Sequence, residues 1–178
     1  DGVLEAAAYI IEKDVIIKKG ETLTIPAGSI LRFGPYAGIV VHGTLLCEGA
    51  IDSPVVFTSL NDRPSSQGGG TASALDWNGI DVRDGAAIDM SFCRVTYSTY
   101  GVQAGAGVNL RFADVVFASN GRSNVSVAGS TAPVEDGRPF SYATGLSAGA
   151  APRKPQLPPA NAGVDAHSRK KAPVLRIT

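Results

Sequence analysis

Three aspartates and an arginine that follow one another closely are the side chains of this sequence best suited to chemistry: Asp81, Arg83, Asp84 and Asp89. Two carboxylates with separated pKa values can hydrolyse a glycosidic bond, one as the acid and the other as the base or nucleophile. A cation beside them can instead help to remove a proton from a uronate carbon, because it stabilises the developing negative charge. These residues are therefore the candidate catalytic residues, and the elements that carry them decide whether they can cooperate.

An internal repeat shows where those elements lie. The segment IDMSFCRVTYSTYG (88–101) aligns with VNLRFADVVFASNG (108–121), at an offset of 20 from 88 to 108, and the apolar positions coincide. GETLTIPAGSILRF (20–33) aligns in the same way with HGTLLCEGAIDSPVVF (42–57). Apolar residues alternate over short stretches and then stop at Gly, Pro, Asn or Asp, which is typical of short strands joined by turns.

The strands fall into three sets, and each coil of the chain contributes one strand to each set. A strand then pairs in parallel with its counterparts one coil before and after, which predicts an all-β parallel β-helix of about four coils. A β-sandwich, whose strands pair antiparallel through hairpins, is the alternative. The first set is 15–18, 38–41, 79–82, 101–104 and 124–127; the second is 22–25, 44–47, 87–90 and 107–110; the third is 30–33, 54–57, 94–97 and 114–117.

These sets place the candidate carboxylates apart. Asp81 points outward from the first set and Asp89 from the second, so the two face different sides, and no second carboxylate stacks on either. Solvated surface charge is therefore the preferred interpretation of the cluster. The outward positions are Ile16, Val40, Asp81, Gln103 and Ser126 in the first set, and Thr24, Leu46, Asp89 and Asn109 in the second.

Four segments carry a resemblance to a known family: GETLTIPAGSILRF (20–33), GTLLCEGAIDSPVVFTS (43–59), WNGIDV (77–82) and SFCRVTYSTYGV (91–102). Over residues 14–127 the chain resembles bacterial right-handed β-helix domains of the pectin-lyase-like superfamily, which implies a secreted or cell-envelope protein. That superfamily includes polysaccharide lyases and hydrolases as well as adhesins and structural modules, so the resemblance implies no single activity. Its polysaccharide-cleaving members place several carboxylates on one exposed ladder, for acid/base chemistry or calcium. Their clustered aspartates and Arg-x-Lys sequence do not occur within residues 14–127.

Charge is divided unevenly along the chain. The 178 residues contain 16 Lys and Arg against 16 Asp and Glu, but residues 1–127 have 9 basic and 13 acidic side chains (net −4) and residues 128–178 have 7 and 3 (net +4). The second part also holds 7 of the 11 prolines, a composition that cannot bury enough apolar surface to fold alone. We expect an N-terminal cap at 1–13, the β-helix at 14–127 with a loop insertion at 60–76, and an extended, basic, Pro/Ala-rich tail at 128–178.

The open strand edges at the ends of a β-helix need a cap or a partner. Two outward valines of the third set indicate a covered face, and the closing segment APVLRIT is an alternating extended strand suited to addition at an edge. We expect the tail to dock on its own or a neighbouring subunit, giving homo-oligomers or filaments; a linker toward another domain is the alternative. The predicted partner-binding residues are Val56, Val116, Val174, Leu175, Arg176 and Ile177.

Two classes of function fit these observations. The first is a non-catalytic structural, adhesive or assembly module of a secreted or cell-envelope protein, with no cofactor. The second is a carbohydrate-active domain that binds or cleaves an extracellular polysaccharide, as a lyase or glycoside hydrolase, and only this second class would use Ca²⁺. The neutral total charge argues against a nucleic-acid binder, and no apolar run approaches the roughly 20 residues of a membrane span. Cys47 and Cys93 are interpreted as buried thiols.

Overall fold

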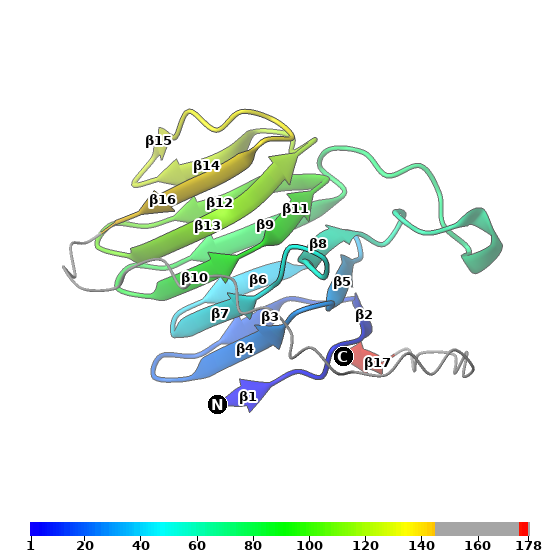
Figure 1. The fold of residues 1–178 in the computed structure, drawn as a ribbon, viewed down its shortest axis with the longest axis horizontal. Coiled ribbons are helices and arrows are strands. Elements are labelled where there is room, and N and C mark those ends of the chain that lie inside the picture. Colours follow the sequence, from blue (N-terminus) through cyan, green and yellow to red (C-terminus); the bar gives the residue numbers. More distant parts are fainter. Residues whose placement is uncertain (145–174, 178) are drawn as a thin grey trace.

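A computed structural model describes residues 1–144 and 175–177 of the chain. It shows an all-β parallel solenoid whose short strands stack along one axis (Figure 1). The predicted parallel β-helix is confirmed, but the expected count of about four coils is wrong, because the solenoid has about six turns. Among the described residues the structure has no helix of the length and apolarity that crossing a membrane requires.

The three predicted sets of strands form two hydrogen-bonded sheets. We call the sets the first, second and third stack. The first stack is a sheet of β3 (Val15–Ile17), β6 (Gly38–Val41), β9 (Trp77–Val82), β12 (Ser98–Ala104), β14 (Ser123–Val127) and β15 (Ser130–Thr131). The second stack is β1 (Gly2–Val3), β4 (Thr22–Pro26), β7 (Thr44–Glu48), β10 (Ala87–Ser91) and the start of β13 (Asn109–Ala118). The third is β17 (Leu175–Ile177), β2 (Ala8–Ile11), β5 (Ile30–Phe33), β8 (Val55–Ser59), β11 (Cys93–Thr96) and the end of β13, with β16 (Pro139–Ala143) beside β13.

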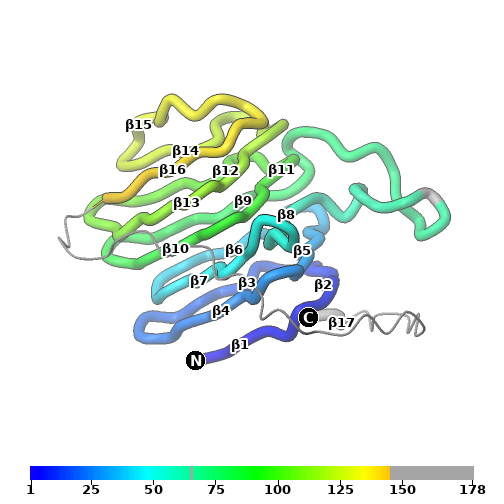
Figure 2. Tube along the Cα trace, viewed as in Figure 1, coloured from blue at the N-terminus to red at the C-terminus, as the bar shows by residue number. Residues whose placement is uncertain are grey.

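The additional turns lie at the two ends of the solenoid. At the N-terminus, β1 and β2 lie within the segment expected to be a cap, yet they pair in parallel with β4 and β5 as ordinary strands of the coil. At the other end, residues 128–144 of the expected tail include β15 and β16, which pair antiparallel with β14 and β13. Figure 2 shows these last segments lying on the final coil, while the first strands lie at the opposite end.

The register matches the prediction in the first stack, and it differs from the prediction in the third stack and in the last strand of the second, where Asp89 pairs with Arg111. Val40 pairs with Asp81, and Asp81 with Gln103, as the outward positions require. In the third stack Arg94 pairs with Val116 rather than with Asp114. The predicted alignment is therefore displaced by two residues there. Because strand side chains alternate with a period of two, such a displacement keeps each side chain on its correct face and changes only its neighbour.

The inward side chains of all three stacks form one continuous apolar core. Phe57 and Phe117 are fully buried in the third stack. Trp77 stacks on Phe33 with ring centroids 4.2 Å apart, and its indole Nε1–H donates a hydrogen bond of 2.8 Å to the Thr96 carbonyl oxygen. The ring thus buries a large apolar area while its only polar atom is satisfied, which is the condition under which buried tryptophan stabilises a fold.

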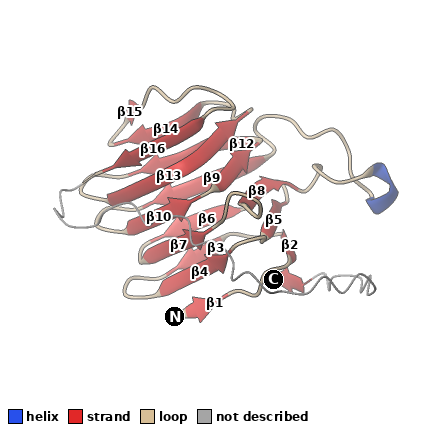
Figure 3. Ribbon diagram, viewed as in Figure 1, coloured by secondary structure: helices blue, strands red, loops and turns tan. Residues whose placement is uncertain are grey.

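Residues 60–76 join β8 to β9 and project from the coil, and the helix η1 (Ser65–Gln67) lies within them (Figure 3). The segment leaves the third stack and returns to the first, so its two ends lie on neighbouring faces of the solenoid. A rigid coil therefore presents this loop at a defined position beside the outer face of the first stack.

Replacement of Phe57 by alanine should test the continuity of the core. The side chain is fully buried, so Phe57→Ala leaves a cavity and should lower the free energy of unfolding by about 3–5 kcal/mol. Ile51, which is 81% exposed in a turn, offers the control: Ile51→Ala should change it by less than about 0.5 kcal/mol. Urea unfolding followed by far-UV circular dichroism measures both, and equal effects of the two variants would contradict the assigned core.

Candidate functional site

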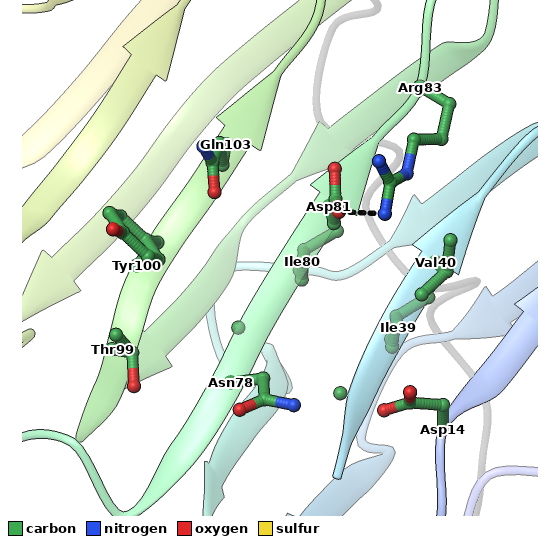
Figure 4. Close-up of a pocket in the computed structure, with 12 residues that line it drawn as sticks. Asp14, Ile39, Val40, Asn78, Ile80, Asp81, Arg83, Thr99, Tyr100 and Gln103 are labelled. Carbon is green, nitrogen blue, oxygen red and sulfur yellow. Dashed lines mark ion pairs between the residues drawn. The ribbon is translucent and has the colours of Figure 1, made fainter. Parts of the chain in front are cut away.

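The outer face of the first stack carries a hollow of about 270 Å³, which extends across β6, β9 and β12 (Figure 4). Its lining alternates with the buried core residues of the same strands, because successive side chains of a strand point to opposite faces. Asp81 and Gln103 lie at one part of the hollow, and Asn78 and Thr99 at another. Most of these groups are polar, so the surface is suited to contacts with hydroxyl and amide groups.

Asp81 is the candidate carboxylate that lies in this hollow. Its Oδ2 accepts from the Arg83 guanidinium at 2.7 Å, and both side chains are partly exposed (36% and 54%). Arg83 directly follows the last residue of β9, and its ion pair neutralises the aspartate two residues before it. Such an exposed pair contributes at most about 1 kcal/mol to stability.

The other two candidate aspartates connect neighbouring coils. Asp89 pairs with Arg111 on the next coil at 2.9 Å, and the two residues lie directly opposite in register. This corrects the expected stack, in which Asn109 lay beside Asp89. Asp84 Oδ1 accepts a hydrogen bond of 2.9 Å from the backbone N–H of Ala106, also one coil further along. Both carboxylates therefore hold one coil to the next.

The structure does not bring the predicted catalytic carboxylates Asp81 and Asp89 together. Asp81 belongs to the first stack and Asp89 to the second, so they lie on different faces as expected. A glycosidase needs two carboxyl groups about 5–10 Å apart across one bound sugar. In the part of the chain that the structure describes, no group of three or more His, Cys, Asp or Glu side chains lies close enough together to hold a metal ion.

A second hollow, of about 320 Å³, adjoins the first, and Asn78 and Thr99 line both. Sequence reasoning missed its most exposed residues. Tyr36 is 87% exposed and Leu75 is 58% exposed, and each has a left-handed backbone with φ of 65° and 74°. Asn78 Nδ2 donates a hydrogen bond of 2.6 Å to the Tyr36 carbonyl oxygen and so helps to hold that conformation. Left-handed backbone in bulky residues is unfavourable and concentrates at functional surfaces.

Asp76 anchors the loop 60–76 beside this second hollow. Its Oδ2 accepts from the Ser59 hydroxyl at 2.5 Å and from the Asn61 amide at 3.2 Å, while Oδ1 accepts from the Ser73 hydroxyl at 3.1 Å. Burial by itself would raise the pKa of Asp76, but the hydrogen bonds from Ser59, Ser73 and Asn61 outweigh burial and lower the pKa below its ordinary value. The ionised carboxylate therefore holds both ends of the loop.

The predicted partner-binding residues lie in two separate places. Val56 and Val116 are half-buried and flank Arg94 in the outward column of the third stack. Val116 also pairs with Pro139 of β16, so the folded chain itself covers one side of it. Residues 175–177 form β17, which pairs in parallel with β2, and Val174 lies outside the described residues.

Comparisons with known proteins reach only part of the chain. No protein-family model and no solved structure matches it. A segment of 53 residues is 40% identical to "Protein bark beetle" of Drosophila melanogaster, and this match spans 30% of the chain and 2% of the Drosophila protein. The chain is thus similar to a short segment of a much longer animal protein. The function of the chain therefore has to be inferred from the geometry of its fold and hollows.

Protonation of Asp76 should loosen the loop. Because the pKa is lowered in the folded protein, the ionised carboxylate contributes stability above the ordinary value of about 4, and this contribution is lost as the pH falls through the folded pKa. Asp76→Asn should therefore destabilise the protein at neutral pH and have a smaller effect near about pH 2.5.

Thermal unfolding and limited proteolysis at both pH values measure this effect. Asp52→Asn, at an exposed turn position, controls for the loss of one carboxylate. Equal destabilisation by Asp76→Asn at the two pH values would contradict the assigned role of the carboxylate.

Proposed function

We propose that this chain is a non-catalytic structural, adhesive or assembly module of a secreted or cell-envelope protein, with the right-handed coil that its resemblance to pectin-lyase-like domains implies. One observation carries the proposal: each candidate carboxylate already has a partner within the solenoid. Asp81 pairs with Arg83, Asp84 accepts from the Ala106 amide, and Asp89 pairs with Arg111.

These partnerships support a scaffold rather than an active site. A general acid or base must be within hydrogen-bond reach of the substrate proton that it transfers. Asp89 and Asp84 instead use their oxygens for contacts between consecutive coils, and a bound substrate would have to displace those contacts. A solenoid built in this way presents a long rigid surface, which suits adhesion and assembly.

Two hollows that adjoin at Asn78 and Thr99 favour a second candidate function, which is the binding of an extracellular polysaccharide. Tyr36 offers an exposed ring at the rim, and amide and hydroxyl groups line the floor. An aromatic face beside convergent polar groups is a common arrangement for orienting a polar ligand with apolar faces, such as a sugar ring. The ion pair of Asp81 with Arg83 leaves that part of the surface without a free cation for a polyuronate, which favours a neutral chain.

Incubation with a panel of acidic and neutral polysaccharides, with and without Ca²⁺, tests the non-catalytic proposal. We expect no unsaturated and no reducing ends, because Asp81 and Asp89 lie on different faces and cannot act on a common ligand. The variant Asp81→Asn/Asp89→Asn should be indistinguishable from wild type in this assay. Release of either kind of end by wild type, and its loss in the variant, would replace the scaffold with an enzyme.

Affinity electrophoresis in gels containing a neutral polysaccharide tests the second candidate. Tyr36→Ala should raise the apparent Kd by about two- to tenfold, because a stacking contact contributes about 0.5–1.5 kcal/mol. Tyr142→Ala, at an exposed tyrosine of β16 outside both hollows, is the matched control and should leave retention unchanged. Equal retention of wild type and Tyr36→Ala across the panel would exclude the hollows as the binding surface.

A further inference from the structure

The C-terminal strand β17 occupies the position that a preceding coil would fill. It runs parallel to β2, with Leu175 opposite Tyr9, Arg176 opposite Ile10 and Ile177 opposite Ile11. Figure 1 shows it beside β2, at the opposite end of the solenoid from β16. The last residues of the chain thus extend the third stack beyond its first strand.

The sequence of this segment matches the stack that it joins. Residues 174–177 read Val-Leu-Arg-Ile, and residues 30–33 of β5 read Ile-Leu-Arg-Phe. The register places the likenesses in the same columns, because Tyr9 pairs with both Leu175 and Leu31, and Ile10 with both Arg176 and Arg32. The C-terminal segment is therefore a copy of a third-stack strand that is separated from the repeats in the sequence.

The two ends of the solenoid differ in a way that matters for assembly. At the end that carries the last coil, β16 and β15 pair antiparallel with β13 and β14. Phe140 packs over Phe112 and Phe117 there, with ring centroids 6.2 and 6.4 Å away. Antiparallel strands interrupt the parallel stacking there. At the first end, β2 accepts a parallel strand, so the stack can be extended in its own direction.

We propose that the outer edge of β2 is an exchangeable docking site for a parallel strand, and that the C-terminal segment of a second copy of this chain is the partner that replaces its own β17. This inference rests on the assembly role proposed above and names its contact. Every copy carries both the edge and the segment, and the exchange makes the same backbone contacts in a new pair of chains.

The length of the connection allows the exchange. Residues 145–174, between β16 and β17, number 30 by sequence, and 30 residues span up to about 100 Å when extended. At low protein concentration the segment of the same chain has the higher effective concentration, whereas at high concentration a second copy competes.

Full-length protein with Leu175→Pro and Arg176→Pro tests the docking edge. Alternate residues of a parallel strand donate to the neighbouring strand, so two successive prolines remove a donor whichever residue faces β2. In β2 the amides of Tyr9 and Ile11 face β5, because the Ile30 N–H donates to the Ala7 carbonyl oxygen and successive residues of a parallel strand alternate, so the amides of Ala8 and Ile10 face β17. We expect protection of the Ala8 and Ile10 amides from hydrogen exchange to be lost in this variant, while the Tyr9 and Ile11 amides stay protected. A synthetic peptide of residues 172–178 should restore it, whereas the same peptide with the two prolines should not.

Refolding at increasing concentration, followed by size-exclusion chromatography with light scattering, tests the second copy as partner. Wild type should form dimers or longer species as the concentration rises, and the double-proline variant should stay monomeric. Wild type that stays monomeric, or a variant that assembles equally, would overturn the proposal, as would a peptide that fails to restore protection. Polysaccharide cleavage in the earlier assay would remove the scaffold role without changing these readouts, so the two failures are distinguishable.

Discussion

Parallel hydrogen bonding between consecutive coils is the constraint on which the rest of this structure depends. A strand in such a stack is bonded on both sides only if the coil before and the coil after place a strand at the same position, so the chain must repeat its three strands in order. Because the interior is shared by all coils, the inward residues of every turn must be apolar and of compatible size, as Leu45, Ile88 and Leu110 are in the second stack. The choice of side chain is less restricted at the outward positions, the corners and the two ends.

The outward positions of this chain are used largely to strengthen the same connection between coils. Asp89 and Arg111 form an ion pair in one column, and Asp84 reaches the backbone of the following coil. Buried polar groups also connect the coils. The Thr96 hydroxyl donates to the Thr58 hydroxyl at 3.0 Å and the Ser98 hydroxyl donates to Asn120 Oδ1 at 2.6 Å, each between different coils. Residues that would suggest acid/base chemistry in a shorter motif are here part of the stacking, and the adjoining hollows with Tyr36 at their rim form the surface available to a ligand.

The repeat does not determine how the solenoid ends. A parallel stack has no internal signal that stops it, so termination requires a change of direction or an added segment. This chain uses both: β16 and β15 reverse the direction at one end, and β17 extends the stack at the other. The first is built from residues adjacent to the last coil, whereas the second comes from the far end of the chain. This difference in sequence distance makes the first end an integral part of the fold and the second a contact that another molecule can supply.

The sequence by itself determined the all-β parallel architecture, the inward faces of the strands and the separation of Asp81 from Asp89. These features follow from alternation and repetition along the chain, which do not depend on the exact register between neighbouring strands. Only the tertiary structure decided the register of the third stack and of the last second-stack strand, the number of turns and the partners of the polar groups. Apolar alternation matches equally well at any even displacement, so the alignment of Arg94 with Asp114 was as good as the true pairing with Val116. Phe92 and Asp114 have left-handed backbone where the second stack meets the third, and the side chain of Phe92 gives no indication of that conformation in the sequence. The pairing of a three-residue strand with β2 likewise depends on a free edge, which exists only once the coils have stacked.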